Sequence, residues 1–238
     1  MSALESQIAV VTGAARGAGE AIARKLATLG AHVVLVARDA GRLEQVRDRI
    51  QKAGGHATAL PCDLTDPAAI ARLGEQVAGD FRRCDILVNN AAIGIETKPL
   101  HEVSVEDWDR LMATNLRAPY LMIRALTPLM IAARSGHIVN ISSLAGRSPL
   151  PGLAPYAASK WGLNGLTYSV AEELRQYNVR VSVIAPGSIN THFGDGGSGK
   201  DPKKMLQPED IAEVVASIVT QAPQSFISEV LLRPTQKP

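Results

Sequence analysis

Tyr156 and Lys160 stand four positions apart in the sequence and could together carry out proton transfer. Positions i and i+4 share one face of a helix, so the lysine ammonium group would lie beside the phenol. A neighbouring positive charge favours the phenolate, and we therefore expect Lys160 to lower the pKa of Tyr156 from about 10. Such a tyrosine could act as a general acid or base near neutral pH. Because many surface helices carry the same spacing, the pair needs support from other residues.

Two hydroxyl side chains, Ser142 and Ser143, lie at the end of a strand predicted over residues 137–142. One of them could hydrogen-bond a substrate carbonyl group. A serine hydrolase is disfavoured, because no carboxylate–histidine pair accompanies the serines in a recognisable motif. We expect the histidines to be structural or surface residues: His32, His56, His101, His137 and His192.

A glycine-rich turn, TGAARGAG at residues 12–19, lies directly between a predicted strand and a predicted helix. Glycine lets the backbone turn tightly and approach a pyrophosphate, whose charge is favoured by the amides and dipole of the helix N-terminus. The spacing is G-x-x-x-G-x-G and differs from the commoner G-x-G-x-x-G pattern. We interpret the segment as a cofactor-binding turn, and a plain tight turn is the alternative.

The end of the second predicted strand suggests which dinucleotide is bound. Arg38 follows this strand, and with Arg16 in the glycine turn it could form a clamp of two guanidinium groups suited to the 2′-phosphate of NADP. Asp39 could instead bind the ribose 2′-hydroxyl of NAD, but we prefer it as the N-cap of a helix at residues 40–53. The alternative for the arginines is a solvated surface position. We expect NADP(H).

Three further polar positions allow two interpretations each. Asp63 follows the third predicted strand and could contact the adenine amino group or cap a helix at residues 67–79. The asparagines at 89–90 could hold neighbouring backbone segments together or form a turn. Asn115 lies within a predicted helix, four residues before Pro119. It could be a surface residue, or its position beside a proline kink could expose a free carbonyl group.

Short β-branched runs alternate with longer amphipathic segments along the chain. Nearly continuous apolar strands indicate burial on both faces, so the alternation predicts a parallel sheet with helices on both sides and ligands bound beyond the carboxyl ends of the strands. The expected strands are 8–12, 32–37, 57–60, 85–89, 137–142, 179–185 and 226–232. The expected helices are near 17–29, 40–53, 67–79, 104–133, 155–177 and 208–221.

The composition is that of a single globular domain over residues 1–238. A formal net charge of +2 does not indicate nucleic acid or an anionic membrane as partner. We expect a cytoplasmic protein, because no signal-peptide core and no apolar membrane span are present. Cys62 and Cys84 lack metal-ligand spacing, and we expect two buried, reduced thiols and no metal site. Trp108 and Trp161 are interpreted as core or interface residues.

Taken in order, these motifs resemble the single-domain branch of the short-chain dehydrogenase/reductase family, including its 3-oxoacyl carrier-protein reductases and carbonyl reductases. Ser143 precedes Tyr156 by 13 residues, as in that family. The resemblance implies an α/β fold, a Rossmann-type doubly wound seven-stranded parallel sheet with helices on both faces. It rests on TGAARGAG (12–19), NNAA (89–92), Asn115, NISS (140–143), YAASK (156–160) and PGSINT (186–191).

The resemblance implies a tetrad in which Tyr156 protonates the carbonyl oxygen during reduction. Lys160 would tune Tyr156 and bind the nicotinamide ribose, and Ser143 would orient the substrate oxygen. Asn115 would hold a water that connects Lys160 to solvent. The implied cofactor-binding residues are Gly13, Ala15, Arg16, Gly17, Ala18, Gly19, Arg38, Asp63, Leu64, Asn90, Ala91, Tyr156, Lys160, Pro186, Gly187, Ile189 and Thr191.

By the same resemblance, residues 191–207 form a substrate lid, and helices 104–133 and 155–177 form an interface of a homodimer or homotetramer. Lysines of the lid could attract an anionic substrate or carrier protein, or be solvated loop charges: Lys200, Lys203 and Lys204. The sequence departs from the usual family pattern at Ala18, Ala92 and Ala185, which affects the expected shape of the pocket and removes no reactive group.

We therefore predict an NADPH-dependent oxidoreductase that reduces a small-molecule carbonyl compound (a ketone, an aldehyde or a 3-oxoacyl thioester) to an alcohol. One alternative is an NAD-dependent dehydrogenase of alcohols or hydroxy acids that uses Asp39. The other is a non-catalytic dinucleotide-sensing protein, which is disfavoured because Tyr156 and Lys160 are both present.

Overall fold

The computed structural model describes residues 2–148, 150–191 and 201–238. Within these residues, seven strands form one parallel sheet in the order β3-β2-β1-β4-β5-β6-β7. The order reverses direction between β1 and β4, the position at which open α/β sheets bind ligands. The strands are β1 (Ile8–Thr12), β2 (His32–Ala37), β3 (His56–Pro61), β4 (Ile86–Asn89), β5 (Gly136–Ile141), β6 (Val179–Pro186) and β7 (Glu229–Leu232).

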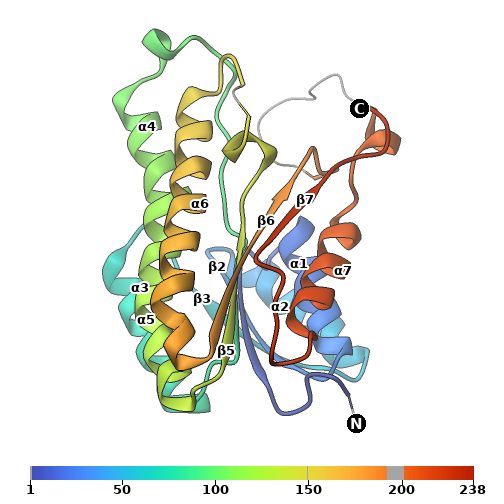
Figure 1. The fold of residues 1–238 in the computed structure, drawn as a ribbon. Helices are drawn as coiled ribbons and strands as arrows, with labels where there is room; N and C mark the ends of the chain where they lie inside the picture. The colour runs from blue at the N-terminus through green and yellow to red at the C-terminus, as the bar shows by residue number, and fades with distance from the viewer. Residues whose placement is uncertain (1, 149, 192–200) are drawn as a thin grey trace.

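Helices cover both faces of this sheet (Figure 1). One apolar cluster packs β1 and β2 against α1, α2 and α7, and a second packs the opposite face against α3, α5 and α6. The fold is therefore the doubly wound Rossmann type that the alternating pattern predicts. The helices are α1 (Gly17–Thr28), α2 (Ala40–Lys52), α3 (Pro67–Phe81), α4 (Val105–Met112), α5 (Ala118–Ala133), α6 (Ala154–Leu174) and α7 (Pro208–Val219).

The central strands form because their residues are β-branched or aliphatic and buried on both sides. All five residues of β1 and the middle four of β2 are buried, which is the pattern of a parallel sheet sandwiched between helices. Short 3₁₀ helices occupy several connections: η1 (Leu100–Glu102), η3 (Leu144–Gly146), η4 (Arg175–Tyr177) and η5 (Pro202–Lys204). In the described part of the chain, no helix is long and apolar enough to cross a membrane.

The segment expected as one helix over 104–133 is divided. A π-helical turn, η2 (Ala113–Arg117), separates α4 from α5. Pro119 lies in the first turn of α5, where its missing N–H would weaken the α-helical ladder with the preceding turn. π-Turns inside helices often occur at functional sites, and this one contains Asn115.

Two other expectations need correction. The last strand was expected from residue 226, but β7 begins at Glu229, because residues 226–228 reach β6 through a side chain and a single backbone bond. Trp108 and Trp161 are 37% and 51% exposed, which excludes the core alternative for them and leaves the interface alternative. Cys62 and Cys84 are buried free thiols, as predicted.

Candidate active site

The first two turns of α6 place Tyr156 and Lys160 on one face. Pro155 lies in the first turn, where its fixed backbone angle suits a helix start. Lys160 is only 2% exposed, and its Nζ donates to the backbone oxygen of Ile141 at 3.0 Å. The same Nζ lies 5.8 Å from the centre of the Tyr156 ring. The i, i+4 spacing therefore brings the ammonium group and the phenol together.

Burial controls the proton affinities of this pair. Burial raises the pKa of Tyr156 to about 12, and a hydrogen bond with the side chain of Ser143 acts in the opposite direction. Burial lowers the pKa of Lys160 to about 8, because desolvation penalises the charged form. The expectation of a lowered Tyr156 pKa is therefore wrong, because burial raises it and the group that acts in the opposite direction is Ser143, not Lys160.

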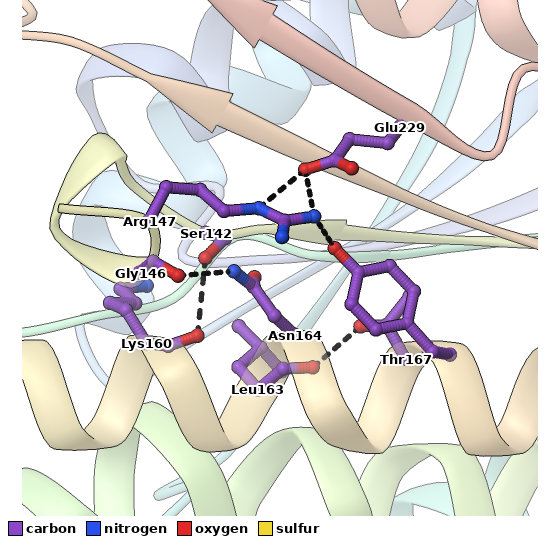
Figure 2. Close-up of polar contacts among 9 residues, drawn as sticks. Ser142, Gly146, Arg147, Lys160, Leu163, Asn164, Thr167 and Glu229 are labelled. Carbon is purple, nitrogen blue, oxygen red and sulfur yellow. Dashed lines mark hydrogen bonds and ion pairs between the residues drawn. The ribbon is translucent and has the colours of Figure 1, made fainter.

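Only one of the two serines at the end of β5 faces Tyr156. Ser143 has an extended backbone, begins η3 and accepts a hydrogen bond from the backbone N–H of Ala145 at 3.1 Å. Ser142 is buried, and its Oγ donates to the backbone oxygen of Lys160 at 3.4 Å (Figure 2). Ser143 is thus the serine that bonds to the Tyr156 side chain, and Ser142 anchors the turn on α6.

Asn115 ties three segments together from the π-helical turn. Its side chain is fully buried, and it pairs with both backbone groups of Ile93, accepting from N–H at 2.8 Å and donating to the oxygen at 2.9 Å. The same amide nitrogen lies 3.3 Å from Ser159 Oγ, which in turn donates to the backbone oxygen of Tyr156 at 2.7 Å. Asn115 is therefore no surface residue, and its side chain connects to the helix of Tyr156.

The glycine turn after β1 needs glycine at particular positions. Gly13 and Gly17 have φ angles of 68° and 58°, which L-residues with a side chain rarely adopt. A Cβ atom on Gly19 would lie 2.1 Å from the backbone oxygen of Gly13, and one on Gly17 would lie 3.1 Å from Thr191 Cγ2. The turn thus leaves bare backbone at the N-terminus of α1, which is what close approach of a pyrophosphate requires.

Thr12 is a residue that the sequence reasoning missed. Its buried Oγ1 accepts from the backbone N–H groups of Asn90 at 3.0 Å and Ala91 at 3.1 Å, and it donates to Val88. The Asn90 side-chain Nδ2 donates a hydrogen bond to the backbone oxygen of Thr12 at 3.0 Å. These bonds hold the glycine turn beside the end of β4. A hydroxyl residue at the buried end of an otherwise apolar strand was the available signal.

The paired asparagines at the end of β4 both bind neighbouring segments, which favours the first of the two interpretations of this pair. Asn89 faces Asn140 across the β4–β5 pairing and donates to its side-chain oxygen at 2.9 Å. Asn140 donates in turn to Thr167 Oγ1 of α6 at 2.9 Å. These buried bonds therefore link β4 and β5 to α6 at Thr167, 11 residues beyond Tyr156.

Arg16 and Arg38 lie in the loops that follow β1 and β2. Arg16 directly precedes α1, Arg38 follows β2, and both are exposed. Neither forms an ion pair with another of the described residues. Asp39 accepts from the backbone N–H of Arg42 at 3.0 Å, so it is the N-cap of α2, as preferred from the sequence.

Asp63 does not cap the helix that follows it. Its Oδ1 accepts from both the backbone N–H and the hydroxyl of Thr65, at 2.9 and 2.8 Å, and these bonds lower its pKa. The N-cap of α3 is Asp66, which accepts from the backbone N–H of Ala68 at 2.8 Å. The capping interpretation of Asp63 is therefore wrong, and the carboxylate stays at the end of β3.

The loop after β6 closes over the glycine turn. Gly187 donates to the backbone oxygen of Leu232 at 2.8 Å, and Ile189 forms a bridge with Leu206. Thr191 is the last described residue before the gap and lies against Gly17. Residues 192–200, including His192 and Lys200, lie outside the described part of the structure. Lys203 and Lys204 are exposed in η5.

The remaining expected cofactor residues lie at the same edge of the sheet. They follow the carboxyl ends of β1, β3 and β4 or lie at the end of β6, so the parallel topology alone brings them together. Of these residues, Ala18 and Leu64 are buried, Ala15 and Ala91 are partly buried, and Pro186 ends β6.

This fold, with a glycine turn after its first strand and a tyrosine–lysine pair on α6, is that of a Rossmann-type oxidoreductase. The family model described as short chain dehydrogenase matches residues 7–198. The chain belongs to the short-chain dehydrogenase family.

Relatives of known structure or name agree with this membership. A crystal structure of a metagenomic short-chain oxidoreductase in complex with NADP is 55% identical, with a TM-score of 0.89 over 99% of this chain and 100% of that one. An alcohol dehydrogenase of the archaeon Thermococcus sibiricus, complexed with 5-hydroxy-NADP, is 29% identical, with a TM-score of 0.91 over 98% of each chain. The 3-oxoacyl-[acyl-carrier-protein] reductase of Synechocystis is 34% identical over 96% of this chain and 95% of its own.

Proposed function

We propose that the protein is an NADPH-dependent oxidoreductase that reduces a ketone, an aldehyde or a 3-oxoacyl thioester to an alcohol. The observation that carries the proposal is the hydrogen bond between the side chains of Ser143 and Tyr156, with Lys160 on the same face of α6. Ser143 follows β5, Tyr156 and Lys160 lie on α6, and the three meet at the carboxyl edge of the sheet. A proton donor, an orienting hydroxyl and a cation at one point are what carbonyl reduction requires.

The residues at this edge fit an NADP molecule. The glycine turn offers backbone that a Cβ atom would obstruct, and two exposed guanidinium groups, Arg16 and Arg38, could hold the 2′-phosphate. Asp39 is engaged as a helix cap, which disfavours its use as the ribose ligand that would select NAD. The relative that is 55% identical was crystallised with NADP, which supports the same choice here.

The side chains support the following proton transfer. When bound, NADPH supplies the hydride to the carbonyl carbon. Ser143 orients the carbonyl oxygen, and Tyr156 donates its phenolic proton to that oxygen. The raised pKa of Tyr156 keeps the phenol protonated at neutral pH, as the acid in a reduction must be. Lys160 stabilises the phenolate that remains, and Asn115 joins the π-helical turn to the start of α6.

The direct test is NADPH oxidation by the purified protein against a panel of ketones, aldehydes and acyl thioesters. Tyr156→Phe removes only the hydroxyl group, so it should abolish turnover and leave the Kd for NADPH nearly unchanged. A Tyr156→Phe variant as active as the wild type would refute the proposed acid. A protein that binds NADPH without turning over any carbonyl compound would favour the dinucleotide-sensing alternative.

We also propose that the chain is one domain whose residues 191–207 form the substrate lid. We further propose that the protein assembles as a homodimer or homotetramer. Large exposed aromatic side chains on α5 and α6 support this assembly: Tyr120, Trp161 and Tyr168. Exposed aromatic groups gathered on neighbouring helices are typical of protein interfaces. Analytical ultracentrifugation of the wild type and of Trp161→Glu would test the assembly, and a monomeric wild type would refute it.

A further inference from the structure

The polar stripe that carries Tyr156 and Lys160 continues along α6. Asn164 and Tyr168 follow at the next two i+4 positions, so all four side chains lie near one face of the helix. The proposed chemistry uses only the first two. The other two contact the turn that begins at Ser143, which Figure 2 shows lying over this face of α6.

Asn164 binds the backbone of that turn. Its Nδ2 donates to the backbone oxygen of Gly146 at 2.8 Å. A Cβ atom on Gly146 would lie 2.8 Å from the same nitrogen and 3.0 Å from the backbone oxygen of Lys160, so the turn rests directly on the helix. The bond from Ser142 Oγ to the Lys160 backbone oxygen fastens the other side of the turn.

Arg147 provides a second anchor at the end of the turn. Its Nε donates to Glu229 Oε1 of β7 at 2.7 Å, and its Nη2 donates to Glu229 and to the hydroxyl of Tyr168. The guanidinium carbon also lies 5.3 Å from the centre of the Tyr168 ring. One side chain thus joins the turn, the edge strand of the sheet and α6 (Figure 2).

Burial of the Asn164 carboxamide lowers the stability of the folded protein. It is 3% exposed, and its Oδ1 has no hydrogen-bond partner in the part of the chain that the structure describes. A buried acceptor without a partner is unfavourable, and an apolar residue of the same size would avoid that penalty. Among the described residues, the one hydrogen bond of this carboxamide goes to the Ser143 turn, which indicates a role in holding that turn.

We propose that Asn164 is a positioning residue: it fixes the turn 143–147 on α6 so that Ser143 stays within hydrogen-bonding distance of Tyr156, with Arg147 and Glu229 as the second anchor. The inference rests on the function proposed above for Ser143 and Tyr156. It adds to that function a set of side chains that touch neither substrate nor cofactor and act through Ser143.

Asn164→Leu tests the proposal against Thr167→Val, a control that removes two buried hydrogen bonds on the same helix, to Asn140 and to the backbone oxygen of Leu163, without touching the turn. The hydrogen bond from Ser143 lowers the pKa of Tyr156, so Asn164→Leu should raise that pKa, and Thr167→Val should leave it unchanged. Lys160, the ionisable group that faces Tyr156 among the described residues, is retained in both variants. The pKa is read from ¹³C-tyrosine NMR, with Tyr156→Phe assigning the signal.

Kinetics give a second readout. The kcat of Asn164→Leu should fall about tenfold or more, while the Kd for NADPH stays within twofold, because a displaced orienting group affects the reacting geometry and not the cofactor. Asn164→Leu and Thr167→Val with equal Tyr156 pKa values and equal kcat would overturn the proposal. If Asn164→Leu does not fold, Glu229→Gln, which weakens the second anchor, should raise the Tyr156 pKa by a smaller amount. An unchanged Tyr156 pKa in Glu229→Gln would then overturn the proposal. Because the NMR titration needs no turnover, it decides the positioning role even if the proposed carbonyl reduction fails.

Discussion

The Nζ of Lys160 lies 3.0 Å from the backbone oxygen of Ile141, the last residue of β5. This bond crosses from the helix to the sheet and holds the ammonium group at the strand end from which Ser143 follows. The side chain is buried along its whole length, so its charge is poorly solvated, and its pKa is lowered to about 8. The charge is thus close to its titration point at physiological pH.

The rate of carbonyl reduction should therefore depend on the charge of Lys160. The value of kcat/KM reports groups on the free enzyme, and it should fall by about tenfold per pH unit above pH 8 as Lys160 loses its proton. Tyr156, with a pKa of about 12, stays protonated over this range. Lys160→Met should be less active by roughly a hundredfold or more and lack this alkaline decline. A wild-type profile that is flat from pH 7 to 10 would contradict the assignment.

Arg38→Asp should weaken NADPH binding selectively. Loss of a charged hydrogen bond to the 2′-phosphate corresponds to about a 10- to 100-fold rise in the Kd for NADPH, and the Kd for NADH should change little. Fluorescence titration with both cofactors measures the two values. Arg42→Ala is the matched control, because Arg42 is an exposed arginine on α2 paired with Asp39. Equal losses for NADPH and NADH would show that Arg38 does not contact the phosphate.

Gly19→Ala should abolish cofactor binding, and Gly165→Ala should not. A methyl group at Gly19 would lie 2.1 Å from the backbone oxygen of Gly13, so the turn after β1 has to shift. Gly165, inside α6, has open space around the same position, and alanine there should raise the free energy of unfolding by about 1 kcal/mol. Urea unfolding and NADPH titration of both variants provide the check. NADPH binding by Gly19→Ala with wild-type affinity would show that the glycine turn does not bind the cofactor.

Acid should destabilise the protein through His137. Ser182 Oγ donates to the backbone oxygen of Ile227 at 2.6 Å, so His137 must donate to Ser182 from Nε2, and its Nδ1 has no partner among the described residues. Burial holds the pKa of His137 at about 3, well below its ordinary 6.5. The unfolded chain therefore binds the proton first as pH falls, and stability present above pH 6.5 is lost progressively toward pH 3.

The expected loss in unfolding free energy from His137 is about 2 kcal/mol between pH 7.5 and pH 5. Urea titrations at both pH values measure it. His137→Gln keeps a donor for Ser182 and cannot take up a proton, so it should lose this part of the pH dependence. The same change at His101, which is exposed on η1, should have no effect. A His137→Gln variant with the full wild-type acid sensitivity would assign the effect to other groups.

Most of the fold could be predicted because the signals are local. Continuous apolar runs such as Ile8–Thr12 identify buried parallel strands, and the alternation with amphipathic segments specifies the sheet and its two helical layers. The parallel topology then fixes where polar residues after each strand must meet. The i, i+4 spacing was likewise sufficient to place Lys160 beside Tyr156.

What could not be predicted depends on tertiary packing. The pKa of Tyr156 follows from desolvation, which the spacing to Lys160 does not reveal. The sequence interpretation left Asp63 as a possible cap of α3, and the structure shows that Asp63 binds Thr65 while Asp66, directly before Pro67, is the cap. Trp161 is apolar by type but lies outside the core, because α6 turns it away from the sheet. Asn164 gave no signal, since its partner is a backbone oxygen distant in sequence.

The wide turn at Ala113–Arg117 also has a geometric effect on the long helical segment that contains it. Successive residues of an α-helix are rotated by about 100°, so one extra residue in a turn advances every later side chain by that angle. The register of α4 is thereby uncoupled from that of α5, and each can face its own neighbours. Removing a single residue here would rotate Asn115 away from Ile93 or pull α5 out of step with the sheet. Chain length at this point is thus as much a determinant of the site as residue identity.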